Sequence, residues 1–180
     1  MPREVWSMRA LVIVESTFGN TRAVAEAVAE GLASRADVQV QDVDASPAEL
    51  SADVDLLVVG GPTHAFGLSR IGTRTNAVAR SEPHATTGAG LREWLERLHP
   101  ARAGVAAVAF DTRINSPKVP GSAARAARRR LARLGFDVTR PPESFFVSGR
   151  EGPLAPGELD RARSWGRALA TPEELTHRTA

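Results

Sequence analysis

Short apolar runs alternate with amphipathic helical stripes along this chain, and this alternation constrains the fold more than any other feature. Runs of the kind expected for strands lie at 10–15, 37–43, 54–60 and 104–110, and a fifth is centred on 145–147. Between them, apolar residues recur every three or four positions, as they do on one face of a helix. Strands that alternate with helices in this way indicate an α/β fold built on a parallel sheet.

The apolar runs differ in a way that predicts the order of the strands. The first, third and fourth runs are almost wholly apolar, which is typical of central parallel strands covered on both faces. The run at 37–43 instead alternates Val38, Val40 and Val43 with polar residues, as an edge strand does. Because crossovers between parallel strands are right-handed, we predict a doubly wound five-stranded parallel sheet of order 2-1-3-4-5 with helices on both faces. The helical stripes are Val24, Val28 and Leu32; Leu91, Trp94, Leu95 and Leu98; Ala124, Ala127, Leu131 and Leu134; and Leu159, Ala162, Trp165 and Leu169.

The length of 180 residues predicts one domain over 1–180, with 1–8 and 171–180 as loosely held arms. A further short helix is expected within 44–53, and the long segment 68–90 is expected to be a functional or mobile loop. No apolar run approaches the roughly 20 residues of a membrane span, so a cytoplasmic protein is expected. The absence of Cys excludes a disulfide framework, and the four His are too scattered to indicate a metal site.

A segment rich in hydrogen-bonding groups, Ser16-Thr17-Phe18-Gly19-Asn20-Thr21, follows the first strand run directly and precedes a helix. The first turn of a helix offers unpaired backbone N–H groups and a positive dipole end, and glycine lets the backbone approach a ligand. We interpret the segment as a phosphate-binding loop, with simple helix capping by Asn20 or Thr21 as the alternative. The chain contains neither G-x-x-x-x-G-K-[ST] nor G-x-G-x-x-G, which argues against a nucleoside triphosphatase and a dinucleotide fingerprint.

Two more loops follow the third and fourth strand runs, at the carboxyl ends where open parallel sheets bind ligands. The first is Pro62-Thr63-His64-Ala65-Phe66-Gly67, in which a loop of small residues carries an imidazole and a phenyl ring. Such a loop can approach the edge of a flat heteroaromatic ligand and stack on its face; alternatively, Phe66 fills the core and His64 is solvated. The second, Asp111-Thr112-Arg113, can form an opposite wall through hydrogen bonds, or a solvated loop with an Asx turn.

These three loops, in this order, resemble those of the flavodoxin family, and the resemblance covers roughly residues 9–170. The 16–21 segment looks like the family's phosphate loop, T/S-x-T-G-x-T, and the other two fall where the flavin-flanking loops belong. The resemblance implies non-covalently bound FMN, with the phosphate on the first loop and the isoalloxazine between the other two, where Phe66 is expected to pack against or beside the ring. Phe18 stands where the family has a third hydroxyl, and the chain has no Tyr to stack on the flavin.

The resemblance implies a redox protein whose chemistry belongs to the cofactor, so no catalytic side chain is expected. An electron carrier that serves a redox partner protein or a small-molecule acceptor is the leading interpretation. The alternatives are an FMN-dependent NAD(P)H:quinone-type reductase and a flavin-free binding module that has kept the fold. A phosphorylated receiver domain is excluded, because Gly60-Gly61 stand where its Asp would end the third strand, and no G-x-S-x-G nucleophile elbow is present.

Five arginines crowd one predicted helix: Arg125, Arg128, Arg129, Arg130 and Arg133. The apolar stripe of this helix must cover the sheet, so Arg125, Arg128, Arg129 and Arg133 are expected to point outward. They can form a solvated face or a docking surface for an acidic redox partner or a cofactor phosphate. Because no aromatic residue interleaves with them, we expect no specific nucleic-acid binding, only weak binding that vanishes near physiological salt.

Overall fold

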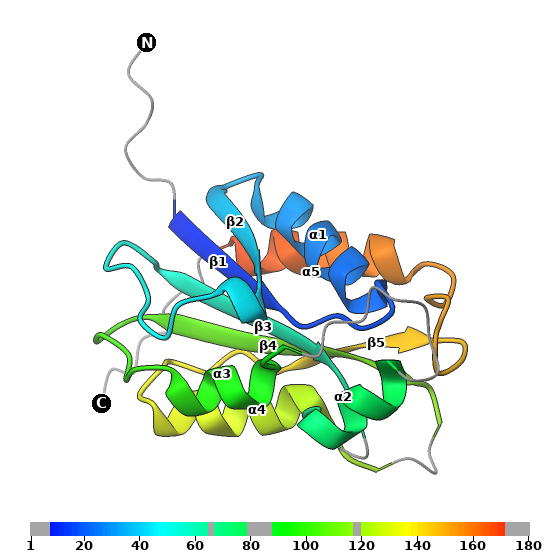
Figure 1. The fold of residues 1–180 in the computed structure, drawn as a ribbon. Helices are drawn as coiled ribbons and strands as arrows, with labels where there is room; N and C mark the ends of the chain where they lie inside the picture. The colour runs from blue at the N-terminus through cyan, green and yellow to red at the C-terminus, as the bar shows by residue number, and fades with distance from the viewer. Residues whose placement is uncertain (1–7, 65–66, 79–87, 117–119, 172–180) are drawn as a thin grey trace.

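The sheet has the predicted architecture. The computed structural model describes residues 8–64, 67–78, 88–116 and 120–171, which build a five-stranded sheet between two layers of helices (Figure 1). The strands are β1 (Met8–Val14), β2 (Ala36–Asp42), β3 (Leu56–Pro62), β4 (Ala106–Ile114) and β5 (Glu143–Val147). All neighbouring pairs are parallel in the order β2-β1-β3-β4-β5, which confirms the predicted topology. The expected arms at 1–8 and 171–180 lie, except for Met8 and Thr171, outside the described residues.

The helices lie on both faces of the sheet. They are α1 (Asn20–Leu32), α2 (Ile71–Val78), α3 (Leu91–Arg97), α4 (Ala123–Arg133) and α5 (Glu158–Leu169), with a short 3₁₀ turn, η1 (Val43–Ala45). α1 and α5 cover one face, and α3 and α4 cover the other (Figure 1). Two expectations were wrong in detail. The helix expected within 44–53 is only η1, and α2 occupies part of 68–90, where a loop was expected because no strong apolar stripe marks a helix there.

The continuous apolar character of β1 has a direct structural cause. Successive side chains of a strand point to opposite faces, and here both faces are covered. Ala10, Val12 and Val14 pack toward α1 and α5. Leu11 and Ile13 belong to the core on the α3 and α4 side. The same strand therefore supplies both hydrophobic layers, as the sequence pattern predicts.

Helices α1 and α5 approach each other so closely that their contact requires glycine on both. A Cβ atom on Gly166 would lie 2.2 Å from the carbonyl oxygen of Val28. A Cβ atom on Gly31 would lie 2.2 Å from the carbonyl oxygen of Arg163. Because both obstacles are backbone atoms, no side chain can rotate away, and the spacing of the two helices depends on these glycines.

Packing also explains the glycine near the carboxyl end of β3. A Cβ atom on Gly60 would lie 2.0 Å from Cζ of Phe110, so the phenyl ring covers the strand at this point. Phe110 in turn makes edge-on contacts with Phe145 and Trp165, with ring centroids 6.0 Å and 6.2 Å away. This aromatic cluster secures the sheet beneath the loops that follow β3 and β4.

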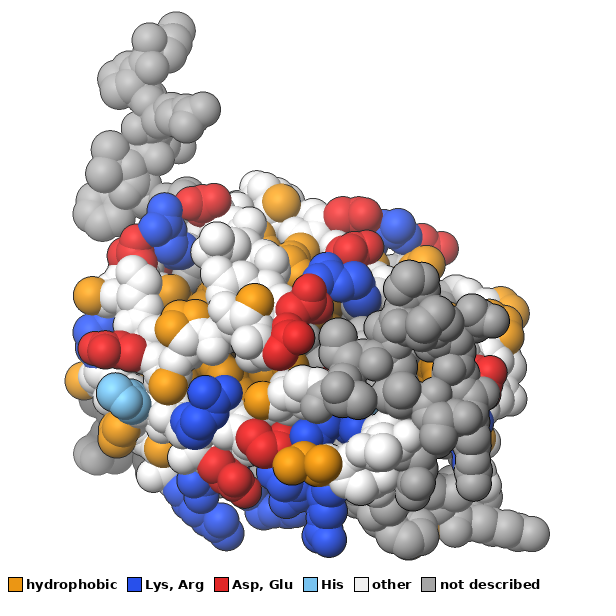
Figure 2. Space-filling model, in the orientation of Figure 1, with side chains coloured by type: hydrophobic (Ala, Val, Ile, Leu, Met, Phe, Trp, Pro, Cys, Tyr) orange, Lys and Arg blue, Asp and Glu red, His pale blue; other side chains and the backbone are white. Residues whose placement is uncertain are grey.

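The surface is unevenly charged. On the face shown in Figure 2, acidic and basic side chains both occur around the upper elements, and Arg side chains gather along the lower edge with acidic side chains just above them, where Figure 1 places α3 and α4. None of the helices in the described part of the chain is both long and apolar enough to cross a membrane.

Candidate functional site

The three candidate loops meet at one edge of the sheet. Strand order reverses between β1 and β3, and the carboxyl ends of β1, β3 and β4 lie side by side there. Open parallel sheets bind ligands at this kind of position. The hydroxyls of Thr21 and Thr112 lie 2.7 Å apart, and the N–H of Thr63 donates to the carbonyl oxygen of Thr112 at 3.0 Å. The residues that the sequence singled out in three separate segments are thus neighbours in space.

The first segment turns directly into α1 and leaves backbone donors open. Gly19 precedes the helix with a φ of +88°, which L side chains rarely adopt, and no side chain caps the helix from this position. The Ser16 hydroxyl oxygen accepts from the N–H groups of Gly19 (3.1 Å) and Arg22 (3.3 Å). The described residues supply no acceptor for the N–H groups of Asn20 and Thr21. Such a helix start is suited to an anion.

The remaining side chains of this segment have other roles. Thr21 is buried, and its hydroxyl is engaged with Thr112. The side-chain amide of Asn20 donates to the carbonyl oxygen of Glu151 at 2.9 Å. Neither side chain caps α1, so the capping alternative does not describe this loop. Thr17 and Phe18 are half-buried beside it.

The second segment is a tight turn at the end of β3. Pro62 is the last residue of the strand, and beyond it His64 and Gly67 exchange two backbone hydrogen bonds of 2.8 and 2.9 Å. The hydroxyl of Thr63 donates to Oδ2 of Asp111 at 3.0 Å, which ties the base of this turn to β4. Ala65 and Phe66, which come between His64 and Gly67 in the sequence, lie outside the described residues.

The third segment was wrongly expected to be a loop. β4 continues through Ile114, because Thr112 pairs with Pro62 of β3 and Arg113 pairs with Phe146 of β5. Asp111 accordingly faces the interior and is fully buried. Arg113 donates to the carbonyl oxygen of Gly121 at 2.8 Å.

Asp111 anchors the start of α4. Its Oδ2 accepts hydrogen bonds from the Ser122 hydroxyl (2.5 Å) and the Ala124 N–H (3.0 Å), in addition to that from Thr63. A carboxylate at a helix N-terminus is stabilised by the unpaired N–H groups and by the helix dipole. Asp111 therefore positions the turn after β3 against α4.

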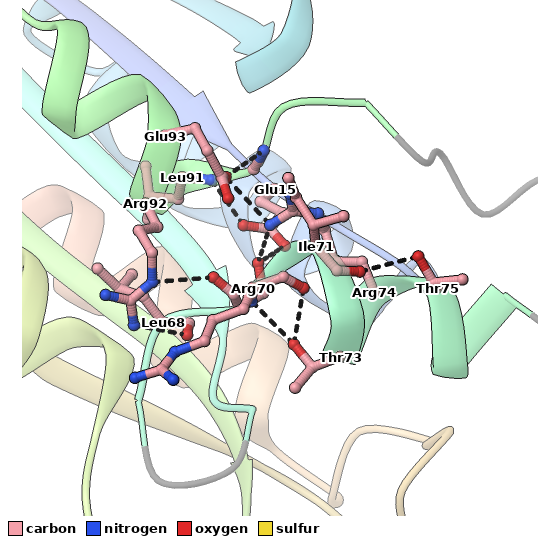
Figure 3. Close-up of polar contacts among 12 residues, drawn as sticks. Glu15, Leu68, Arg70, Ile71, Thr73, Arg74, Thr75, Leu91, Arg92 and Glu93 are labelled. Carbon is pink, nitrogen blue, oxygen red and sulfur yellow. Dashed lines mark hydrogen bonds and ion pairs between the residues drawn. The ribbon is translucent and has the colours of Figure 1, made fainter.

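A buried charged cluster beside the first loop was missed from the sequence. Glu15 ends the apolar run of β1 and is only 6% exposed. One carboxylate oxygen accepts from the Ser69 hydroxyl, and the other accepts from the N–H of Leu91 at 2.7 Å. Nη1 of Arg74 donates to Ser69 at 2.9 Å and lies 3.1 Å from Oε2 of Glu93. Figure 3 shows these side chains converging between α2 and α3, with Arg92 directed away from them.

The cluster fastens the crossover between β3 and α3 to the end of β1. Arg74 is 4% exposed, and its Nε and Nη2 have no hydrogen-bond partner among the described residues. Burial alone would raise the pKa of Glu93, but Arg74 and the Gly90 N–H hold it below its usual value. A Cβ atom on Gly90 would lie 2.3 Å from Nη1 of Arg74, so a larger residue there would displace the buried guanidinium. The signal in the sequence was a single carboxylate at the end of an otherwise apolar strand.

Comparison with known proteins finds similarity to the family that the three loops resemble. A sequence model of the flavodoxin family, described as Flavodoxin, matches residues 12–90, which include the first two candidate loops. The resemblance to the flavodoxin family is confirmed. No curated protein sequence matches this flavodoxin-like chain.

Solved structures of flavodoxins share the whole fold at low sequence identity. A flavodoxin from the domain Archaea is 20% identical, with a TM-score of 0.60 over 91% of this chain and 96% of that one. Oxidised flavodoxin 1 from Bacillus cereus is 15% identical, with a TM-score of 0.62 over 88% of this chain and 94% of that one. A flavodoxin from Streptococcus pneumoniae TIGR4 is 16% identical, with a TM-score of 0.62 over 91% and 98%. The flavodoxin-like fold therefore extends well beyond the segment that the family model matches.

His64 lies within the electrostatic field of the Glu15 cluster. It is half-buried, and burial lowers the pKa of its imidazole below the usual value of 6.5. Glu15 opposes this effect and Arg74 adds to it, with a net lowering. The imidazole is therefore neutral at pH 7 and can accept a hydrogen bond at the site.

We expect His64 to make the stability of the flavodoxin-like chain pH-dependent below its unfolded-state pKa of about 6.5. Because the folded state binds the proton less tightly, the stability that His64 contributes is complete above that pH and decreases as the pH falls through the unfolded and then the folded pKa. Urea unfolding at pH 7.5 and 5.5 measures the loss. The His64→Gln variant should lose less stability between these two pH values, and an equal loss would contradict the assignment.

Proposed function

We propose that this flavodoxin-like chain binds FMN non-covalently and transfers electrons through it to a redox partner protein or a small-molecule acceptor. The family match supports an FMN-binding redox protein at the level of the family. The observation that carries the proposal for this chain is the 16–21 loop, whose open N–H groups lie where strand order reverses. FMN, when bound, supplies reversible electron uptake, and the chain supplies its position and surroundings.

The 16–21 loop fits a phosphate group through neutral donors. The N–H groups of Asn20 and Thr21 and the hydroxyl of Ser16 are at the start of α1, where the helix dipole favours a negative charge. The side chain of Arg22 is turned to Asp42 at 2.6 Å, so its charge is already paired. The absence of the third family hydroxyl at Phe18 leaves the backbone as the main source of donors.

The proposed position of the isoalloxazine follows from the walls that the structure describes. Pro62 and Thr112 are paired within the sheet, so a flat ring has to lie beyond them, next to the His64–Gly67 turn. Asp111 holds the base of this turn through Thr63 and holds α4 through Ser122. The proposed contact between Phe66 and the ring falls between His64 and Gly67 in the sequence, outside the described residues.

Simultaneous replacement of Ser16 and Thr21 by Ala should weaken FMN binding by about 1–3 kcal/mol, the scale of the hydrogen bond to a charged group that Ser16 would supply. The Ser16 hydroxyl shapes the donor loop, and the Thr21 hydroxyl links it to β4. The measurement is fluorescence titration of the flavin-free protein with FMN. The wild-type protein loaded with FMN is expected to be yellow. The matched control replaces Ser34 and Thr171, whose hydroxyls donate to the carbonyl oxygens of Gly31 and Arg167. Unchanged affinity in the first variant would contradict the proposal.

A further inference from the structure

The arginines of α4 differ from those on the opposite face of the sheet, many of which are paired with carboxylates. Four arginines on β1, α1 and α5 form ion pairs, each of them with two acidic side chains. These pairs are Arg9 with Asp37 and Asp53, Arg22 with Glu26 and Asp42, Arg161 with Glu143 and Glu158, and Arg163 with Glu30 and Asp160. α4 contains five arginines and no acidic residue, and the structure describes no ion pair for any of them. Within α4 itself, positive charge is therefore not balanced by any acidic side chain.

Two of the five α4 arginines are engaged by the protein itself. Nε and Nη2 of Arg128 donate to the carbonyl oxygen of Val138 at 3.1 and 2.9 Å. Nε of Arg130 donates to the carbonyl oxygen of Leu95 at 3.4 Å. The expectation that Arg128 points outward was therefore wrong, since its guanidinium folds back to cap the chain after α4.

The other three form a single exposed row, which we call the α4 arginine stripe: Arg125, Arg129 and Arg133. Their side chains make no described hydrogen bond or ion pair, and their spacing of four residues puts them on one face of the helix, roughly 6 Å apart along its axis. Like charges at this spacing repel each other within a helix. The flanking Ala126 and Ala132 leave the row sterically accessible.

We propose that the α4 arginine stripe docks an acidic surface of a partner protein, with carboxylates spaced like Asp or Glu at i, i+4 and i+8 of a helix. The stripe starts beside the candidate cofactor site, because the N-cap of α4, Ser122, is held by Asp111 in the carboxyl-terminal half of β4. A partner on the stripe would therefore reach the site edge. The docking itself depends only on the charges of α4 and does not require bound FMN.

The same geometry argues for a protein rather than a nucleic acid. Three available guanidinium groups are fewer than the six to ten phosphate contacts of a typical DNA-binding protein. The outward positions of α4 other than arginine carry Ala, which offers no hydrogen bond to a base edge. An ordered row of three charges instead matches the rim contacts that orient two proteins during association.

The test uses a fluorescently labelled, Ala-rich helical peptide with Glu at every fourth position, titrated with the whole chain at about 20 mM salt, where exposed charges are weakly screened. Replacing all three stripe residues with Gln should weaken binding roughly tenfold, the combined effect of three exposed ion pairs. In the matched control, Gln replaces Arg35, Arg150 and Arg167, which are exposed and lie outside α4. This variant changes the net charge by the same amount, and it should change the affinity for the peptide less than twofold. Thermal unfolding should show that both variants fold.

The outcomes separate this proposal from its competitors. Equal weakening by the two triple variants would overturn it, because net charge alone would then account for binding. Tighter binding of a duplex DNA than of the peptide near physiological salt, lost in the stripe variant, would overturn it in favour of a nucleic acid. Peptide-induced amide shifts in an NMR spectrum should be confined to α4 and its neighbours. Measurements with and without FMN should agree, so failure to bind FMN would leave this result intact.

Discussion

The Gly166→Ala variant is expected to lose about 3 kcal/mol or more of its free energy of unfolding, at the upper end of the cost of overpacking a core. The added methyl would lie 2.2 Å from the carbonyl oxygen of Val28 and 3.0 Å from its carbonyl carbon. Because the obstacle is the backbone of α1, relief requires α1 and α5 to move apart. That movement would loosen the core that contains Val24, Ala162 and Leu169.

Urea unfolding followed by circular dichroism measures this effect, and Gly72→Ala is the matched control. Gly72 lies on α2 with no atom within 4 Å of its added Cβ and without a positive φ. There the same substitution should stabilise the helix by about 0.5–1 kcal/mol through the better helix propensity of Ala. If Gly166→Ala were as stable as the wild type, the described packing of α1 against α5 would be wrong.

The Glu15→Ala variant is expected to cost about 3–5 kcal/mol, the usual effect of removing one partner from a buried ionic cluster. It leaves the N–H of Leu91 and the hydroxyl of Ser69 without their acceptor, and it removes the carboxylate that Arg74 reaches through Ser69. The loss should also free the crossover between β3 and α3 from the end of β1. Hydrogen exchange of the Leu91 amide should therefore accelerate more than that of amides in β4.

Two further variants separate burial and charge in this cluster. Glu26→Ala removes an exposed carboxylate 3.5 Å from Arg22, and it should cost no more than about 1 kcal/mol. Glu15→Gln keeps an acceptor for the Leu91 N–H but removes the charge, so its stability should lie between those of the wild type and Glu15→Ala. A Glu15→Ala variant as stable as Glu26→Ala would contradict the role assigned to the cluster.

The architecture of this chain could be predicted from its sequence, because a strand that is buried on both faces has a continuous run of apolar residues. Residues 10–14 of β1 and 56–59 of β3 are all apolar because they serve two helical layers, and the alternation in β2 identifies an edge. Right-handed crossovers then leave few topologies. The 16–21 loop was readable for a similar reason, because glycine and hydroxyl residues between a strand and a helix are themselves the local determinants of the turn.

The tertiary structure alone decided features that depend on distant partners. β4 extends through Ile114 because β3 and β5 offer it pairing partners, which the polar residues Asp111, Thr112 and Arg113 do not reveal. Asp111 is an anchor for α4 rather than a loop residue for the same reason.

The contacts of charged side chains were the hardest feature to predict from the sequence. Glu15 meets Ser69 and Leu91, which lie 54 and 76 residues away along the chain, and no local pattern encodes that meeting. Arg128 and Arg129 are adjacent and chemically identical, yet one is bonded to Val138 and the other is exposed. Apolar periodicity determined which elements form and which faces they bury, because burial is a property of each segment. Hydrogen-bond partners were decided only by the packed fold, because they require two distant groups to arrive at the same place.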